Sequence, residues 1–324
     1  MSQYHSIQSE DLKNYLPHRG INLLIDKVTQ TDEQTGELCL LLNQNDPAGR
    51  DIFLEHEQSQ FFYNPHLFAE FLALGATVLL KELPAGYIAL FASISNFTVT
   101  ERLIEGDRLY GNIVRQKDRG PLKRFSGILS HNGVDQIGSC DITAYTMNMA
   151  EERNEEKKRI EPPAITLQEK IPPNIFTWKN PSMVFVHTVT DFQSQPYSIT
   201  TRYTYPDDHP FTPGHFPDNP VMMGITQWMM VADTICTLIW KSRNSLPHTR
   251  YDVSADSFIF KEDGTLVSEA KKVAMRMDMA DTHHNGYPIL TATQKIVFRD
   301  MVKPGETIYC LLNNVNIKPL FNLY

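Results

Sequence analysis

Hydrophobic positions along the chain form many short or alternating segments and two long, nearly uninterrupted runs. The long runs, residues 65–82 and 223–243, exceed the length of a buried strand and predict one long helix each. The short segments are typical of strands and lie on both sides of each run. The expected strands are residues 22–29, 37–43, 92–100, 107–116, 122–130 and 136–147 in the first half, and 183–190, 197–205, 252–260, 266–277, 289–299 and 307–316 in the second.

The chain changes character near its middle. Residues 150–159 read AEERNEEKKR, and proline pairs follow at 162–163 and 172–173. Such a stretch packs poorly and predicts a linker. Each half then has the same expected order of two strands, one long helix and four strands. An apolar helix is buried most simply by one antiparallel sheet wrapped around it, which predicts an α+β fold with two similar halves. We divide the chain into residues 1–149, a linker at 150–173, and residues 174–324.

Composition narrows the class of protein. With 324 residues, 41% hydrophobic and 21% charged, the chain is long enough for two domains with real cores. A net charge of −8 argues against a dedicated nucleic-acid binder. The four cysteines are widely spaced without a CxxC pair, which predicts free thiols and no zinc site. Residues 1–9 are polar, and the apolar stretch 221–240 contains Gln227 and Asp233, so we expect a cytoplasmic protein without a membrane span.

Two stretches resemble one enzyme family. Residues 16–28, LPHRGINLLIDKV, are similar to the opening of beta-hydroxyacyl-[acyl carrier protein] dehydratases. Residues 214–224, GHFPDNPVMMG, resemble that family's catalytic histidine motif, with Asn219 and Met223 as mild departures. The resemblance implies the hotdog fold, a sheet wrapped around one helix, and a working dimer. For this chain it implies a double hotdog, an intramolecular pseudo-dimer, with further self-association left open.

The family's active site has three parts, which the resemblance places by spacing. A histidine removes the proton next to the thioester, a backbone N–H nine residues later polarises the carbonyl, and an acid fourteen residues later protonates the leaving hydroxyl. Counted from His215, the two positions are Gly224 and Met229, and counted from His56 they are Pro65 and Glu70. Methionine donates no proton, and proline has no N–H. Because the family pairs the histidine and glycine of one subunit with the acid of the other, one complete and one degenerate site are implied. The complete site is His215, Gly224 and Glu70, and the degenerate site is His56, Pro65 and Met229.

Neighbouring residues receive roles from the same resemblance. His18 and Arg19 belong to the opening motif, and we expect structural or interface roles for them. Asp233 lies one turn beyond Met229. Two roles are possible for Asp233: a structural hydrogen bond to the loop carrying His215, or that of a substitute acid. The structural role is favoured. The residues expected to contact substrate are Phe216, Pro217, Met222 and Met223.

One alignment between the halves is ambiguous. Residues 302–306, VKPGE, resemble the turn IEGD at residues 104–107. Aligning the two turns leaves too few residues for the final strands. Counting strands instead pairs Gly106 with Gly264 and makes 302–306 an ordinary hairpin turn.

The resemblance implies reversible dehydration of a beta-hydroxyacyl thioester to the trans-2-enoyl thioester, in fatty-acid or polyketide-type biosynthesis. It implies no metal and no organic cofactor, since the acyl group arrives on the phosphopantetheine arm of an acyl carrier protein, the expected partner. Two alternatives stay open: a hotdog acyl thioesterase that uses a carboxylate such as Glu70, and a non-catalytic acyl-binding or scaffold protein. The first leaves the His215 motif unexplained, and an intact set of three residues argues against the second.

Overall fold

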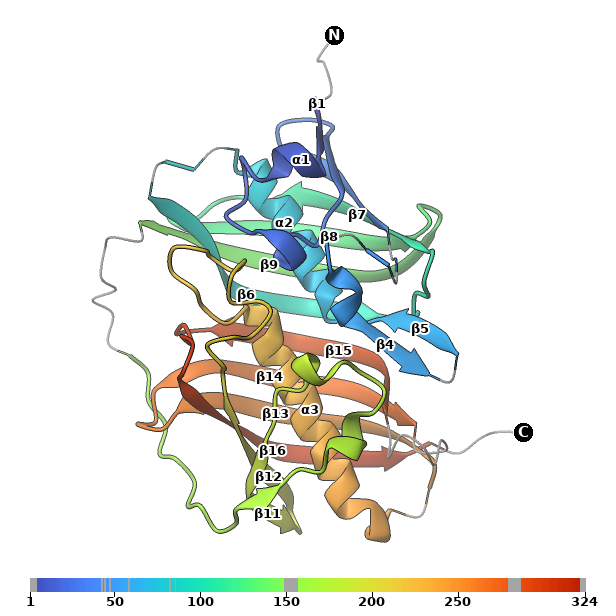
Figure 1. Ribbon diagram of the computed structural model, residues 1–324, viewed down its shortest axis with the longest axis vertical. Helices are drawn as coiled ribbons and strands as arrows, with labels where there is room; N and C mark the ends of the chain where they lie inside the picture. The colour runs from blue at the N-terminus through green and yellow to red at the C-terminus, as the bar shows by residue number, and fades with distance from the viewer. Residues whose placement is uncertain are drawn as a thin grey trace.

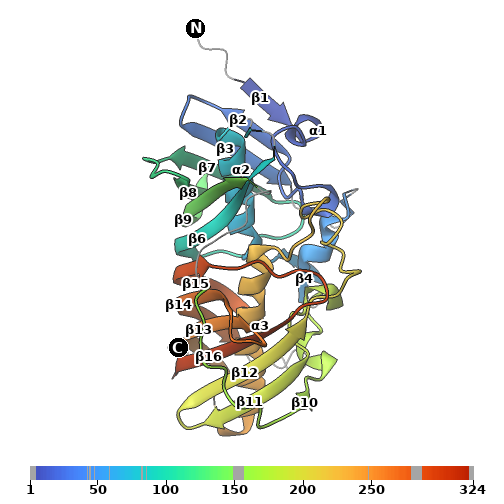
Figure 2. The ribbon, with the colours of Figure 1, turned by 90° about the vertical axis from the view of Figure 1, so that its left-hand side faces the viewer.

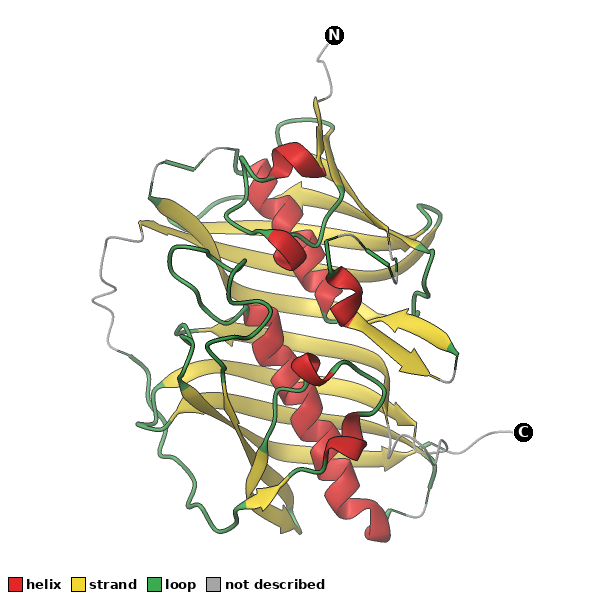
Figure 3. Ribbon diagram, in the orientation of Figure 1, coloured by secondary structure: helices red, strands yellow, loops and turns green. Residues whose placement is uncertain are grey.

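The computed structural model of the protein describes residues 5–320, except residues 42, 44, 47, 58, 82, 85, 149–156, 247 and 279–286. Each half places strands around one long helix (Figure 1 and Figure 3). The first half contains β1 (His5–Gln8), α1 (Ser9–Leu12), β2 (Lys27–Gln30), β3 (Thr35–Leu41), β4 (Leu54–Glu57), β5 (Gln60–Tyr63), α2 (Leu67–Leu79), β6 (Tyr87–Val99), β7 (Arg108–Arg115), β8 (Leu122–His131) and β9 (Asp135–Asn148). The second contains β10 (Glu169–Lys170), β11 (Thr188–Ser194), β12 (Tyr197–Thr204), α3 (Gly224–Ser242), β13 (Arg250–Lys261), β14 (Leu266–Asp278), β15 (Tyr287–Phe298) and β16 (Thr307–Pro319).

Both long helices and most strands lie where the hydrophobic pattern predicts them. The strand expected at residues 183–190 begins later, at Thr188, and a 3-10 turn (Pro181–Met183) takes its start. Proline fixes a helical φ at the first position of that turn, and the Asn180 side chain accepts a hydrogen bond from the Ser182 N–H at 3.0 Å. The hairpin of β4 and β5 was not predicted.

One antiparallel sheet runs through both halves. Its 14 strands follow the order β1-β2-β3-β7-β8-β9-β6-β15-β14-β13-β16-β12-β11-β10. The halves meet where β6 pairs with β15 (Figure 2). In that pairing Ile94 lies opposite Ile296. The helices α2 and α3 lie on the concave side, buried over almost their whole length. Among the described residues, no helix combines the length and apolar character needed to cross a membrane.

The two halves thread their strands through the sheet in different chain orders. The strand at the junction is β6 in the first half, directly after the helix, but β15 in the second, the third strand after the helix. In both halves the next strand in the chain, β7 or β16, returns beside the last strand of the large sheet before the helix, β3 or β12. Helix α2 packs mainly on β3 and β7, and α3 on β16 and β12. The second half is therefore circularly permuted relative to the first after its helix.

This permutation makes the predicted pairing of Gly106 with Gly264 wrong. Gly264 lies in the turn between β13 and β14, where the Lys261 N–H donates to the Thr265 carbonyl at 2.9 Å. Residues 302–306 follow the junction strand β15, just as residues 104–107 follow the junction strand β6. The strands missing from that alignment are β13 and β14, which come before β15 instead of after it.

The described part of the expected linker is attached to the second half. The Ile160 N–H donates to the Gly264 carbonyl at 2.9 Å, and the Leu266 N–H donates to the Lys158 carbonyl at 2.8 Å. Strand β10 then pairs with β11 at the edge of the sheet. Residues 150–156 of the expected linker lie outside the described residues.

Helix α2 sits unusually close to its sheet. A Cβ atom added at Gly75 would lie 2.4 Å from Leu38 Cδ1, so this position accepts only glycine without movement. This close packing against the sheet limits the rotation of the helix. The helix carries Glu70 in its first turn, and its rotation determines where that carboxyl group points.

Candidate active site

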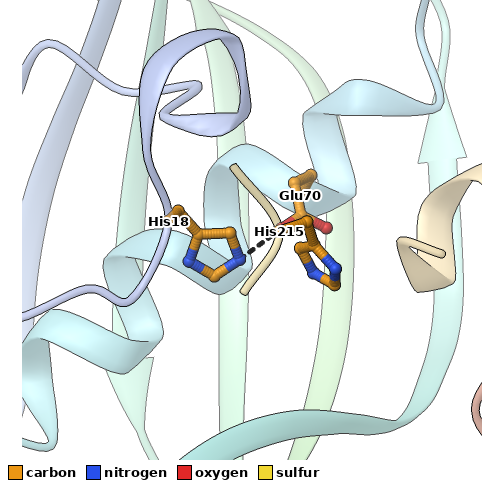
Figure 4. Close-up of side chains that lie close together, drawn as sticks. All are labelled: His18, Glu70 and His215. Carbon is orange, nitrogen blue, oxygen red and sulfur yellow. Dashed lines mark ion pairs between the residues drawn. The ribbon is translucent and has the colours of Figure 1, made fainter. Parts of the chain in front are cut away.

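A pocket between the two halves gathers residues from both. Glu70 comes from α2, His18 from the loop after α1, and His215 from the loop between β12 and α3 (Figure 4). Gly224, the first residue of α3, lines the same pocket. The structure thus brings together the three residues of the expected complete site, two from the second half and one from the first.

The two motif-bearing loops contact each other directly. The Arg19 N–H donates to the Gly214 carbonyl at 2.9 Å, and the Asn22 amide donates to the Phe211 carbonyl at 2.9 Å. A Cβ atom on Gly214 would lie 2.2 Å from the Arg19 carbonyl oxygen, so only glycine allows this approach. The contact holds His18 and His215 together, with ring centroids 5.1 Å apart.

The geometry of His215 leaves one ring nitrogen free to act as a base. Its Nδ1 lies 2.9 Å from the Val221 carbonyl oxygen. A carbonyl only accepts, so Nδ1 carries the hydrogen and Nε2 keeps a lone pair. Burial lowers the pKa of His215 to about 4, partly opposed by the hydrogen bond to Val221. The imidazole is therefore neutral at pH 7 and can accept a proton.

Glu70 has the opposite protonation state. Its side chain is 3% exposed, and burial raises its pKa to about 8. A carboxyl group in this environment is protonated at pH 7 and can donate that proton. Its Oε2 has no hydrogen-bond partner among the described residues. A neutral base and a protonated acid thus line one pocket, which is the arrangement that acid–base elimination needs.

Gly224 contributes a backbone group to the pocket. The first N–H groups of a helix have no acceptor within the helix and carry partial positive charge. They suit an oxygen atom on which negative charge develops. A Cβ atom on Gly224 would lie 3.2 Å from the Phe298 ring and 3.3 Å from the Phe91 ring, so these two rings cover the helix start closely.

The remainder of the pocket is mainly apolar. Alanine side chains on α2, β6 and β9 leave space along one wall, and they are Ala73, Ala76, Ala89 and Ala144. Arg299 and Asp300, which follow β15, add charged groups to the lining. An apolar wall next to polar catalytic groups suits an acyl chain with a polar reacting end.

Only two of the four residues expected to contact substrate reach this pocket. Phe216 and Met222 line it. A turn in which the Asn219 N–H donates to the Phe216 carbonyl at 3.0 Å leaves Pro217 exposed to solvent. Met223 precedes α3 and is fully buried in the core. The structure does not bring Pro217 and Met223 to the pocket, because loop direction is not readable from motif spacing.

The residues expected to form the degenerate second site lie in different surroundings. His56 is half-buried and lines an open groove together with Lys179. Its neighbours in β4, Leu54 and Glu55, are both buried. Pro65 is half-buried just before α2, and Met229 is buried in the core.

A buried polar cluster, Glu55, Asn64, His66, Lys179 and Asp233, lies in this region. Lys179 forms an ion pair with Asp233, which also accepts the Phe185 N–H at 2.7 Å. Asn64 donates to Glu55 at 2.6 Å and accepts from the His66 N–H at 2.9 Å. Asp233 therefore binds Lys179 and Phe185 and not the loop carrying His215. Sequence spacing gave no signal for Lys179 or Glu55, because their partners come from distant segments.

Burial dominates the titration of this cluster. It raises the pKa of Glu55 to about 7 and lowers the pKa of His66 to about 3. Burial also raises the pKa of Asp233, against the Lys179 ammonium and the Phe185 N–H, which lower it. The backbones of Glu55 and Lys179 form an isolated bridge, so the cluster also joins the two halves.

His18 is a site residue that sequence reasoning missed. Its Nε2 lies 3.6 Å from Glu70 Oε1, and its side chain is 7% exposed (Figure 4). The donor atoms of His18, Glu70 and His215 all lie within 4.8 Å of one another, which is close enough to consider a metal ion. The signal was present in the opening motif, but the motif does not show that this loop reaches across to Glu70.

Comparisons with known proteins place the chain among dehydratases. The FabZ 3-hydroxyacyl-[acyl-carrier-protein] dehydratase of Staphylococcus epidermidis is 32% identical over 136 residues, which is 41% of this chain and 90% of the relative. The Staphylococcus aureus enzyme of the same name matches at 32% over 136 residues, 41% of this chain and 89% of the relative. No family model matches the chain.

Solved structures with a similar arrangement include two dehydratases. The dehydratase domain from the CurF module of curacin polyketide synthase aligns with a TM-score of 0.49 and 10% identity, covering 94% of this chain and 100% of that one. The dehydratase heterocomplex ApeI:P from Xenorhabdus doucetiae aligns with a TM-score of 0.37 and 15% identity, covering 42% of this chain and 91% of that one.

Proposed function

Since the chain belongs to the 3-hydroxyacyl-[acyl-carrier-protein] dehydratase family, and is therefore a hydro-lyase, we propose that it dehydrates a beta-hydroxyacyl thioester at one composite site. A large antiparallel sheet with few helices fits the hotdog fold. The finer architecture that we propose is a double hotdog, in which the halves act as the two subunits of a dimer. The composite site would take His215 and Gly224 from one half and Glu70 from the other.

The observation that carries the proposal is that His215, Gly224 and Glu70 line one pocket, with Nδ1 of His215 held by the Val221 carbonyl. His215 Nε2 takes the proton from the carbon next to the thioester, as the electron pair of that C–H bond forms the new double bond. The C–O bond at the beta carbon breaks at the same time or next. Glu70 gives its proton to the departing hydroxyl, which leaves as water.

Gly224 would stabilise the charge that develops between these events. As the α-proton leaves, negative charge moves to the thioester oxygen. The N–H at the start of α3 donates a hydrogen bond to that oxygen, strongest when the charge is largest. A positioned acid or base contributes about 10²–10⁴-fold to such a reaction, and an oxyanion donor about 10²–10³-fold.

The substrate would reach the pocket on a carrier. We propose an acyl carrier protein as partner, with the acyl group on its phosphopantetheine arm and no further cofactor. The apolar wall formed by Ala73, Ala76, Ala89 and Ala144 would receive the acyl chain.

Mass spectrometry of carrier-bound beta-hydroxyacyl thioesters tests the function. The wild-type chain is expected to remove one water, and His215→Ala and Glu70→Gln to lose at least 100-fold in rate. His56→Ala is the matched control, a histidine on the outer side of β4, and should keep wild-type activity. A chelator should leave the rate unchanged if the three donor groups act without a metal.

Other products would identify other functions. Release of free carrier thiol, with loss of the acyl group, would show a thioesterase. An inert wild-type chain across acyl lengths would favour acyl binding without catalysis. A dead His56→Ala variant would contradict the single composite site.

A further inference from the structure

We propose that His18 is a positioning residue for the acid of this site, and that its Nε2–H stabilises the Glu70 carboxylate as the proton leaves for the substrate. The inference rests on the proposed function, because it assigns a partner to the acid of that reaction. It concerns a residue that motif spacing placed outside the catalytic set.

Three features of the structure place His18 in this role. Nε2 faces Glu70 Oε1 at 3.6 Å, from a loop of the same half. His18 is held there by its neighbours, since Arg19 donates through its N–H to the Gly214 carbonyl and through Nη1 to the Leu16 carbonyl at 2.6 Å. His18 Nδ1 is buried and has no hydrogen-bond partner among the described residues. A rigid loop thus aims one ring nitrogen at the acid.

The tautomer of His18 follows from these contacts. Burial, together with the positive charges of His215 when protonated and of Arg19, lowers the pKa of His18 well below its ordinary value, so the ring is neutral and carries one N–H hydrogen. That hydrogen belongs on the nitrogen that has an acceptor within reach. Nε2 faces the Glu70 oxygen, and Nδ1 has no acceptor in the part of the chain that the structure describes, so Nε2 is the donor.

The distance between the two groups shows when the interaction matters. At 3.6 Å the two atoms are close but beyond a normal hydrogen bond. Once Glu70 has given up its proton, a buried carboxylate remains in an otherwise apolar place. A small movement of His18 then forms a charge-assisted hydrogen bond, which is shorter and stronger than a neutral one. The stabilisation therefore appears together with the charge, so it lowers the barrier rather than binding the substrate.

Four titratable or charged groups among the described residues line the pocket with Glu70. They are His18 from the loop after α1, His215 from the loop before α3, and Arg299 and Asp300 after β15. Arg299 is engaged with Glu269 in an ion pair, and Asp300 with Lys157 at 3.0 Å and Lys261 at 3.2 Å. His18 is thus the neutral donor placed against the Glu70 carboxyl group.

The test compares His18→Leu with His18→Gln in the full-length chain. Leucine keeps much of the volume but donates no hydrogen bond, whereas the glutamine amide carries N–H groups at a similar reach. We expect kcat for carrier-bound dehydration to fall about 10- to 100-fold in His18→Leu with little change in KM. His18→Gln should recover a large part of the loss.

A second measurement does not depend on activity. The infrared C=O band of protonated Glu70, assigned by its absence in Glu70→Gln, is followed as pH rises. Losing the donor destabilises the carboxylate, so the pKa of Glu70 should be higher in His18→Leu than in wild type, and in His18→Gln close to wild type. If His18→Leu fails to fold, His18→Asn replaces it, because that shorter amide falls short of Oε1.

The outcomes separate this inference from the function itself. A wild-type chain without dehydratase activity would overturn both. An active wild type with an unchanged kcat in His18→Leu, an equal loss in both variants, or an unshifted Glu70 titration would overturn the role of His18 alone.

Discussion

Replacing Lys179 by methionine tests the buried cluster that lies away from the active pocket. Lys179 and Asp233 form an ion pair whose side chains are 3% and 1% exposed. Methionine keeps most of the volume of lysine and removes its charge. Asp233 then keeps the Phe185 N–H, at 2.7 Å, as its hydrogen-bond donor. A buried carboxylate with so little compensation takes up a proton instead of staying ionised.

The size of the effect follows from that proton. Bringing a carboxyl group of ordinary pKa 3.8 to its protonated form at pH 7 costs about 4 kcal/mol, at roughly 1.4 kcal/mol per pH unit. Because burial already raises the pKa of Asp233 in the wild type, this value is the upper limit of the loss relative to wild type. Breaking a buried pair by removing one partner typically costs about 3–5 kcal/mol. In the folded variant the pKa of Asp233 is raised above its unfolded value, so acid favours the folded state. The loss relative to wild type should therefore shrink as pH falls and nearly vanish at about pH 4.

Urea denaturation at pH 5, 6, 7 and 8 measures this loss. Far-UV circular dichroism is the better probe, because Trp178 is adjacent to the substitution, and coincidence with fluorescence checks that unfolding is two-state. The control is the double variant Lys179→Met with Asp233→Asn, whose amide oxygen still accepts the Phe185 N–H. The free energy of unfolding of this double variant should lie within about 2 kcal/mol of the wild-type value, and the difference should not change with pH.

Two results would refute the reasoning. A Lys179→Met variant as stable as wild type at pH 7 would show that the pair is not ionised in the folded protein. A loss that is the same at all four pH values would show that lost packing, and not an unpaired carboxylate, explains the effect.

The remaining predictions concern the active pocket. Because burial raises the pKa of Glu70 from 4.5 to about 8, the buried carboxyl group destabilises the fold by an amount that increases above pH 4.5. In urea denaturation at pH 7, Glu70→Met should therefore be more stable than wild type by about 3 kcal/mol. Equal stability would contradict the raised pKa. The same values predict that kcat/KM falls below about pH 4, where His215 is protonated, and above about pH 8, where Glu70 is ionised, so a single-limbed profile would argue against one of the two roles. Gly214→Ala, with a Cβ atom 2.2 Å from the Arg19 carbonyl oxygen, should cost about 1–3 kcal/mol and lower kcat. Gly120→Ala, at φ +58° in a turn away from the pocket, should also cost stability through backbone strain but leave kcat unchanged. Equal effects of the two substitutions on kcat would show that the loop contact is not needed.

The sequence by itself determined the two helices and most strands, and it predicted the residues of the proposed composite site. Apolar runs longer than a buried strand, and segments in which apolar and polar residues alternate, are local patterns. The helices predicted at residues 65–82 and 223–243 were therefore found without a structure. His215, Gly224 and Glu70 were found because motif spacing within a chain survives when the local elements survive. Glu55 and His56 show the limit of such spacing. Spacing selected His56, but the buried polar residue is its neighbour Glu55. On a strand, a shift of one residue changes which side chain faces the interior.

Only the tertiary structure decided which strands are neighbours and which side chains meet across segments. The order of β13 to β16 along the chain is the same whether β13 or β15 lies at the junction, so strand counting alone assigned Gly264 wrongly. Contacts between His18 and Glu70, and between Lys179 and Asp233, join segments whose separation carries no periodic signal. Hydrophobic patterning specifies which face of an element is buried, but the partner on that face is chosen by packing of the whole chain.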